Sequence, residues 1–157
     1  MQTLEWRFVD MSAWPDGEWQ SEPDKIQWQD RVTELPCLAV RHPRGGYWCG
    51  YVGVTKDHPA FEKDYDNVDV DVHGGLTFAA HCQADTETGI CHIPEAGEPD
   101  DVWWFGFDCA HLGDTSPGFV ARWGRDSDHG FYKNLAYVQQ ECAQLAKQLA
   151  QMSSRSR

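Results

Sequence analysis

The residues best suited to chemistry lie in two stretches, 73–77 and 108–114, and each stretch follows an apolar run of the sequence. Side chains that leave a rigid strand for a loop are well placed to form a site. Histidine and aspartate can act as acid and base or hold a metal ion, and glycine lets a ligand approach the backbone. If the two strands are neighbours, the stretches converge at one end of a sheet. The candidate ligand-binding residues are His73, Gly74, Gly75, Thr77, Asp108, His111 and Asp114.

Two adjacent tryptophans, Trp103 and Trp104, come shortly before the second stretch. Consecutive residues of a strand point to opposite faces, so one of the two rings can line a pocket and stack on a ligand. Together with the polar residues, this predicts a binding site for a small molecule, with no catalytic residue assigned. Two other interpretations remain open. The same residues can serve a metal-dependent hydrolase, or Asp-x-x-His-x-x-Asp can be turn and buried polar structure only.

Cysteines and histidines suggest a possible zinc site, because these are the usual ligands of tetrahedral zinc. The candidate ligands are Cys82, Cys91, Cys109 and His111, with His81 and His92 beside the first two. The eight-residue gap between the first two cysteines differs from the usual two to four. We therefore expect six reduced, mostly buried thiols, since the N-terminus has no apolar signal segment and disulfides rarely persist in the cytoplasm. The cofactor is left open, with zinc or another divalent metal as the candidates.

Acidic residues outnumber basic ones by 25 to 13 in this chain of 157 residues, which gives a net charge of -12. Direct nucleic-acid binding is disfavoured, because a protein that tracks phosphates should be basic. No apolar run approaches the ~18 residues of a membrane span, so we expect a cytoplasmic protein. Its expected partner is a small molecule or another protein, which the family resemblance described below would make a host protein. Six acids in 57–71 and six in 85–101 leave open an acidic inhibitor or DNA mimic, against a simple role in solubility.

The order of expected elements predicts an α+β fold, with a mostly antiparallel sheet and one long C-terminal helix packed on it. The length fits a single domain over 1–157, with a Trp-rich N-terminal arm at 1–35 and a frayed tail at 153–157. Glycines at 50 and 53 predict a bulge or a close backbone approach. Alternating or apolar runs predict strands at 4–9, 37–41, 47–54, 68–72, 76–80, 91–93 and 102–109.

A helix is predicted over 131–152, where the sequence has no proline or glycine and is rich in Ala, Gln, Lys and Leu. Apolar residues recur there at intervals of three and four, which places them on one face of the helix. We expect this stripe to pack on the sheet. Its members are Leu135, Val138, Cys142, Leu145 and Leu149.

Four stretches carry a family resemblance: EPDKIQW at 22–28, WCGYVGV at 48–54, HGGLTF at 73–78 and WWFGFDCAHLGD at 103–114. The chain resembles a family of small uncharacterised proteins of bacteriophages, prophages and some bacterial genomes. The resemblance implies a mobile-element setting in a host cytoplasm and carries over no catalytic residue. In that setting, a nucleotide-like signal is a natural ligand for a protein that counters a host defence.

Overall fold

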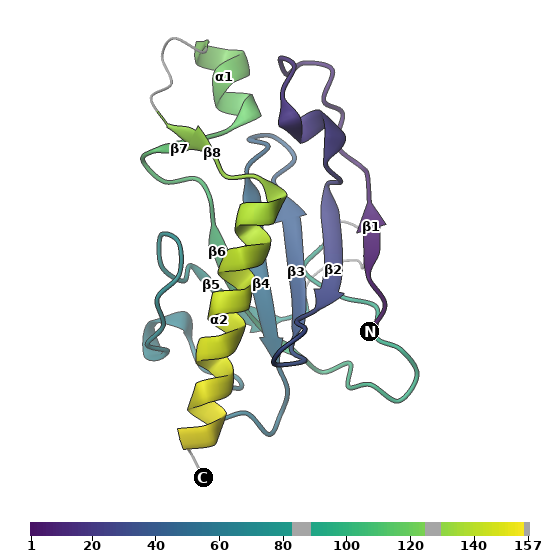
Figure 1. The fold of residues 1–157 in the computed structure, drawn as a ribbon, viewed down its shortest axis with the longest axis vertical. Coiled ribbons are helices and arrows are strands. Elements are labelled where there is room, and N and C mark those ends of the chain that lie inside the picture. The colour runs from purple at the N-terminus through teal and green to yellow at the C-terminus, as the bar shows by residue number, and fades with distance from the viewer. Residues whose placement is uncertain (83–88, 125–129, 156–157) are drawn as a thin grey trace.

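Six strands form one antiparallel sheet, and a long helix lies across one of its faces (Figure 1). The computed structural model describes residues 1–82, 89–124 and 130–155. The strand order is β1-β2-β3-β4-β6-β5, with every neighbouring pair antiparallel. The predicted α+β class is confirmed. The strands are β1 (Leu4–Trp6), β2 (Lys25–Gln29), β3 (Pro36–Arg41), β4 (Trp48–Val54), β5 (Phe78–His81) and β6 (Trp103–Asp108).

The C-terminal helix, α2 (Leu135–Arg155), packs on β3 and β4 through the predicted apolar stripe. Val138, Cys142, Leu145 and Leu149 are fully buried, and Leu135 packs at the edge of this core. No helix of the described residues, α2 included, is long and apolar enough to cross a membrane.

α2 begins four residues later than predicted. Phe131 and Tyr132 form the short strand β8 (Phe131–Tyr132) instead of a first helical turn. The side chain of Asn134 then accepts a hydrogen bond from the Tyr137 N–H at 2.9 Å. An asparagine in this position caps a helix by satisfying a free N–H of the first turn. This cap explains why the helix starts at Leu135.

The predicted close approach at Gly50 is confirmed. A Cβ atom at this position would lie 3.0 Å from the sulfur of Cys142 and would also meet the ring of Phe107. The absence of a side chain therefore lets α2 lie directly on the middle of β4. Only glycine fits this space without moving the helix.

The opposite face of the sheet has a second, smaller core. Leu38, Tyr51 and Trp104 are buried there, and Ile90 packs against them. A segment without regular strands, which we call the strap (residues 89–101), runs over this face. The strand predicted at 91–93 is therefore wrong, because only Ile90 makes an isolated bridge.

The strand predicted at 68–72 is also wrong, although its alternating burial is correct. Val68 and Val72 are buried, whereas Asp71 is exposed. The backbone of Asp71 is bonded to the side-chain amide of Gln148 on α2, which donates to the Asp71 carbonyl and accepts from its N–H. A helix side chain takes the place of a neighbouring strand, so the segment is extended but belongs to no sheet.

The N-terminal 35 residues supply two strands of the sheet, β1, which lies within the predicted strand at 4–9, and β2, which was not predicted. They are tied to the body by Arg41, which is wholly buried. Its guanidinium pairs with Asp24 and Glu22, both at 3.1 Å, and lies over the ring of Trp48. A buried cation with two carboxylate partners is well compensated for its lost hydration.

Four short elements complete the described chain. Ser116 caps the helix α1, because its side chain accepts from the Phe119 N–H, and Pro117 is the first residue of the helix. The elements are α1 (Pro117–Trp123), β7 (Asp114–Thr115), which pairs in parallel with β8, and the 3-10 helices at Glu18–Ser21 and Tyr65–Asn67.

The expectation of six reduced cysteines is wrong, because Cys82 and Cys91 form a disulfide. Cys82 follows β5 directly, and its Cα atom lies 4.7 Å from that of Cys91 in the strap. This separation suits a disulfide. The prediction of reduced thiols came from the N-terminal sequence and the expected cytoplasmic location. Neither says which cysteines lie close together in the fold. The free cysteines are Cys37, Cys49, Cys109 and Cys142.

Candidate functional site

The two predicted stretches converge, and His73 lies at the centre of a hydrogen-bonded chain between them. Its Nε2 is 2.8 Å from Asp114 Oδ2, and its Nδ1 is 2.7 Å from the hydroxyl of Tyr137. Since an ionised carboxylate only accepts hydrogen bonds, Nε2 carries the ring proton of the neutral imidazole. Nδ1 then accepts from the Tyr137 hydroxyl. The hydrogen-bonded chain therefore runs Tyr137–His73–Asp114, and the unprotonated Nδ1 of His73 faces the Tyr137 hydroxyl.

Asp114 is the most buried member of the cluster, with 2% of its side chain exposed. Burial alone raises the pKa of its carboxyl, but three donors outweigh it and leave the pKa below its usual range. The donors are the His73 ring, the His111 N–H at 3.1 Å and Lys133 Nζ at 3.2 Å. The carboxylate is therefore ionised at neutral pH, and it fixes the orientation of His73.

Asp108 and His111 form the second half of the cluster. His111 Nε2 lies 3.1 Å from Asp108 Oδ1 without hydrogen-bond geometry, and it has no hydrogen-bond partner among the described residues. Thr77 donates to Asp108 Oδ2 at 3.2 Å. Gly74, with a positive φ of 69°, lies against the His111 ring, and a Cβ atom there would collide with it. The close approach at Gly74 is thus to the His111 ring, whereas Gly75 faces open space, and the predicted ligand contact of both glycines stays a prediction.

A cavity of about 620 Å³ opens beside His111 and Asp114. Its volume lies within the range of small-molecule sites, roughly 300–1,000 Å³. Tyr47, Leu112 and Phe119 give it an apolar wall, and burial raises the pKa of the Tyr47 hydroxyl, which is thus neutral. We call this space the His111 cavity. Its other lining residues are Gly45, Cys109, Ala110, Gly113, Ser116 and Gly130.

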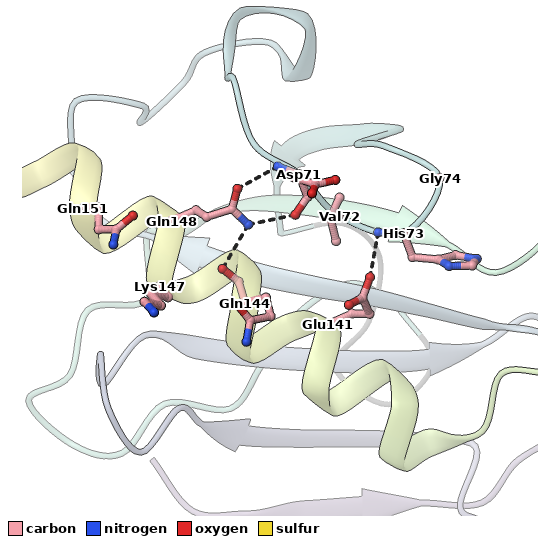
Figure 2. Close-up of a pocket in the computed structure, with 9 residues that line it drawn as sticks. All are labelled: Asp71, Val72, His73, Gly74, Glu141, Gln144, Lys147, Gln148 and Gln151. Atoms are coloured by element: carbon pink, nitrogen blue, oxygen red, sulfur yellow. Dashed lines mark hydrogen bonds between the residues drawn. The ribbon is translucent and has the colours of Figure 1, made fainter.

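A second hollow of about 620 Å³ lies on the other side of His73, between α2 and residues 71–74 (Figure 2). Figure 2 shows Glu141 accepting from the His73 N–H, at 2.8 Å, beside the Gln148 contact with Asp71. The lining is mostly polar, and the side chains of Glu141 and Gln148 are already hydrogen-bonded to the backbone of the extended segment. This hollow positions His73 and has little apolar surface for a ligand.

The predicted role of Trp103 and Trp104 in this site is wrong. The two rings do point to opposite faces, Trp103 toward the α2 side and Trp104 into the second core. However, they start β6, and Asp108 ends it. Five residues of strand span roughly 17 Å. Trp103 instead donates to the Lys63 carbonyl at 2.9 Å, so both rings serve the cores at the far end of the strand.

The cysteine and histidine candidates do not assemble into a zinc site. Cys82 and Cys91 are adjacent as predicted but are bonded to each other. Cys109 is buried in the α2-side core, where burial raises the pKa of its thiol far above the usual range. His111 lies in the polar cluster. Among the described residues, no group of three or more His, Cys, Asp or Glu side chains is placed to hold a metal ion.

All six acids of 57–71 are exposed, as an acidic binding face or a solubility role would require. The second acidic stretch is only partly described, since Asp85 and Glu87 lie outside the described residues. Within it, Asp101 pairs with His81 at 3.1 Å and with Lys56 at 3.6 Å. The inhibitor and DNA-mimic interpretations stay predictions.

Four residues of the site were missed from the sequence. Tyr137 and Lys133 lie at the start of α2 and just before it, and they reach the cluster only because the helix crosses the sheet there. Tyr47 and Phe119 come from the turn before β4 and from α1. None of these positions carries a local motif. Their spacing along the chain gives no sign that they share a site.

No family model, curated protein or solved structure matches the chain. The resemblance to phage and prophage proteins therefore stays a prediction from the four motifs. The functional argument rests on the geometry of the site.

Proposed function

We propose that this chain is a phage- or prophage-type accessory protein that binds a small, nucleotide-like ligand in the His111 cavity. The supporting observation is the placement of His111 and Asp114 on a cavity whose other wall is formed by Tyr47, Leu112 and Phe119. Aromatic and aliphatic side chains bind the faces of a planar ring system, and a few polar groups fix its orientation. The role against a host defence follows from the setting that the family resemblance implies.

A hydrolase is the second candidate, and the chain Tyr137–His73–Asp114 favours it. An imidazole oriented by a carboxylate, with its free nitrogen on an O–H group, is the arrangement of a general base. Burial raises the pKa of the Tyr137 hydroxyl, however, so this O–H is a poor proton source at neutral pH. We therefore rank binding above hydrolysis.

Ligand binding is tested first by mass spectrometry of any small molecule that co-purifies with the protein. Purified protein is then titrated with AMP, cyclic AMP and ADP-ribose in a calorimeter, with chromatography of each mixture to detect products. We expect binding without turnover. Turnover that is lost in Tyr137→Phe would favour the hydrolase. The proposal would be contradicted if no small molecule co-purifies and none of the three nucleotides binds.

His111→Ala is the most informative variant. His111 is over a third exposed, so its removal should leave the melting temperature nearly unchanged while ligand binding falls by tenfold or more, about 1.4 kcal/mol. His73→Ala is less suitable, because it would leave Asp114 buried without its closest donor. His81→Ala, at an exposed histidine outside both the cluster and the His111 cavity, is the control and should bind normally. Equal binding by His111→Ala and His81→Ala would exclude this cavity as the site.

A further inference from the structure

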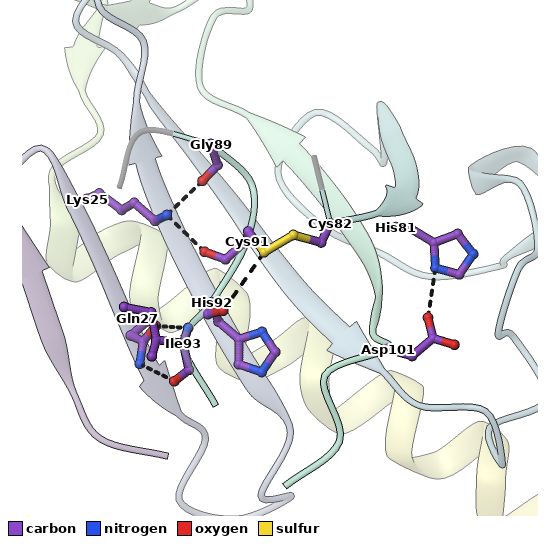
Figure 3. Close-up of a disulfide and its surroundings, with 9 residues drawn as sticks. All are labelled: Lys25, Gln27, His81, Cys82, Gly89, Cys91, His92, Ile93 and Asp101. Atoms are coloured by element: carbon purple, nitrogen blue, oxygen red, sulfur yellow. Dashed lines mark hydrogen bonds and ion pairs between the residues drawn. A yellow bond between two sulfur atoms is a disulfide. The ribbon is translucent and has the colours of Figure 1, made fainter. Parts of the chain in front are cut away.

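The strap is attached to the second face of the sheet by polar contacts and one covalent bond (Figure 3). Gln27 on β2 binds both backbone groups of Ile93, donating to its carbonyl at 3.1 Å and accepting from its N–H at 2.8 Å. The disulfide joins the strap at Cys91 to Cys82 at the end of β5. The strap is thus fixed to β2 by side chains and to β5 by sulfur.

Lys25 is the most unusual group beneath the strap, because its side chain is wholly buried. Its ammonium donates to the carbonyls of Gly89 at 2.7 Å and of Cys91 at 2.9 Å, and it lies 4.9 Å from the centre of the Trp6 ring. A buried charge is tolerated only while such partners replace water. Two of these partners, the carbonyls of Gly89 and Cys91, belong to the strap and flank Ile90. Movement of the strap would therefore expose the ammonium.

The disulfide is accessible at one end. Cys82 is exposed, whereas Cys91 is half-buried under the strap. Thiol–disulfide exchange requires attack of an external thiolate on one sulfur of the bond, and the exposed position of Cys82 favours attack at that end. The four free cysteines cannot compete for it, since Cys37, Cys109 and Cys142 are buried and burial raises the pKa of the Cys49 thiol to about 12.

We propose that the Cys82–Cys91 disulfide is a reversible clip, and that its reduction by a dithiol lifts the strap and uncovers Lys25 and the second core. In the exchange, one thiolate of the dithiol bonds to the Cys82 sulfur as the S–S bond breaks. The second thiolate then releases Cys82, so the dithiol is oxidised to its disulfide. Two electrons and two protons pass to the protein, which ends with two thiols.

The surface under the strap contains a buried polar group that would gain a hydrogen-bond partner if the strap moved. Trp104 is fully buried there, and its indole N–H has no hydrogen-bond partner in the described structure. The ring of His92 packs edge-on against it at 5.3 Å, and burial lowers the pKa of this histidine. A buried donor without a partner is costly, so water or another partner gains access favourably once the strap moves. This site is separate from the His111 cavity, and its failure would not affect the proposed function.

The experiment compares labelling of Lys25 before and after reduction. Wild-type protein is acetylated at neutral pH with an N-hydroxysuccinimide ester, with and without dithiothreitol, and each lysine is quantified by peptide mass spectrometry. We expect Lys25 labelling to rise on the order of tenfold on reduction, because local opening limits access to a buried group. Exposed Lys63 should be labelled equally in both states. The Cys82→Ser/Cys91→Ser variant should resemble reduced protein, and Cys49→Ser should resemble oxidised protein.

Three results would overturn the proposal. Labelling of Lys25 that stays constant while the thiol count rises from four to six would show that the strap is held without the clip. A thiol count that stays at four would show that the bond is not exchangeable. Alkylation of the fully buried Cys142 in parallel with Lys25 labelling would show unfolding of the whole protein in place of local opening. The first two measurements use wild-type protein and remain decisive if a variant does not fold.

Discussion

One face of the sheet is covered by α2 through apolar side chains, whereas the other is covered by the strap through a disulfide and two buried polar side chains. On the α2 side, Val138, Cys142, Leu145 and Leu149 have no polar requirement beyond the helix backbone. On the strap side, the second core is small, and Lys25 and the other strap contacts need specific backbone atoms in place.

This difference indicates which face of the sheet can be uncovered by a local movement. Apolar contacts stabilise in proportion to buried area and tolerate small shifts. Polar contacts between buried groups are lost as a set when one segment moves, and each unmatched group then requires water. The α2 face should therefore respond to the loss of volume or the gain of charge, whereas the strap face should respond to reductant and to proton concentration.

Leu145→Asp is expected to have the largest effect and would break the α2 side of the comparison. It places a carboxylate in a fully buried apolar stripe and should lower the free energy of unfolding by on the order of 4 kcal/mol. Gln144→Asp, one residue away and exposed, is the matched control and should change it by less than about 0.5 kcal/mol. Urea denaturation followed by circular dichroism measures both. Equal stability of the two variants would mean that α2 is held through another face.

Lys25→Met should have an intermediate effect and tests the strap side. The methionine keeps most of the aliphatic stem but leaves the Gly89 and Cys91 carbonyls without their donor, at a cost of about 1–3 kcal/mol. Lys63→Met, at an exposed lysine, is the control. A Lys25→Met protein as stable as wild type would show that the cost of burying the ammonium equals what its hydrogen bonds contribute, and the polar description of this face would be wrong.

The smallest effect is a pH dependence that arises from His92 on the strap face. Burial lowers the pKa of His92 below its ordinary value of 6.5, so the unfolded chain binds a proton there more readily than the folded protein. The associated stability is present above pH 6.5 and is lost as pH falls toward the pKa of the folded state. In His92→Phe, this part of the profile should be flat. Thermal melts from pH 8 to pH 5 compare the two proteins, and parallel curves would rule out His92 as the source.

The sequence predicted the regular parts of the fold because hydrophobic periodicity determines them. The stripe on α2, the strands β3, β4 and β6, and the close approach at Gly50 follow from residue spacing or from glycine. The same rule misled at 68–72, because alternating burial does not say what the backbone is bonded to. There, Gln148 on the helix replaces a strand partner. β2 was missed because its inward residues Lys25 and Gln27 are polar.

The candidate site was predicted in part. His73, Asp108, His111 and Asp114 do converge, because β6 ends at Asp108 and α2 holds the extended segment that carries His73 alongside it. The partners from α2 and the turn before β4 depend on how distant elements cross, which local sequence does not encode. The disulfide was missed for the same reason. Proximity of Cys82 and Cys91 is a property of the returning chain and not of their spacing.

Glu141 and Gln148 are seven residues apart on α2, and they bind backbone groups of His73 and Asp71, which are two residues apart. The spacing of these two side chains on the helix therefore fixes the register of the extended segment that lies alongside it. Insertion of one residue between 141 and 148 would rotate Gln148 by roughly 100° away from Asp71 while Glu141 kept its place. The tolerance of α2 to insertions thus depends on this register as well as on its apolar stripe, and a change there would be transmitted to the turn that carries His73.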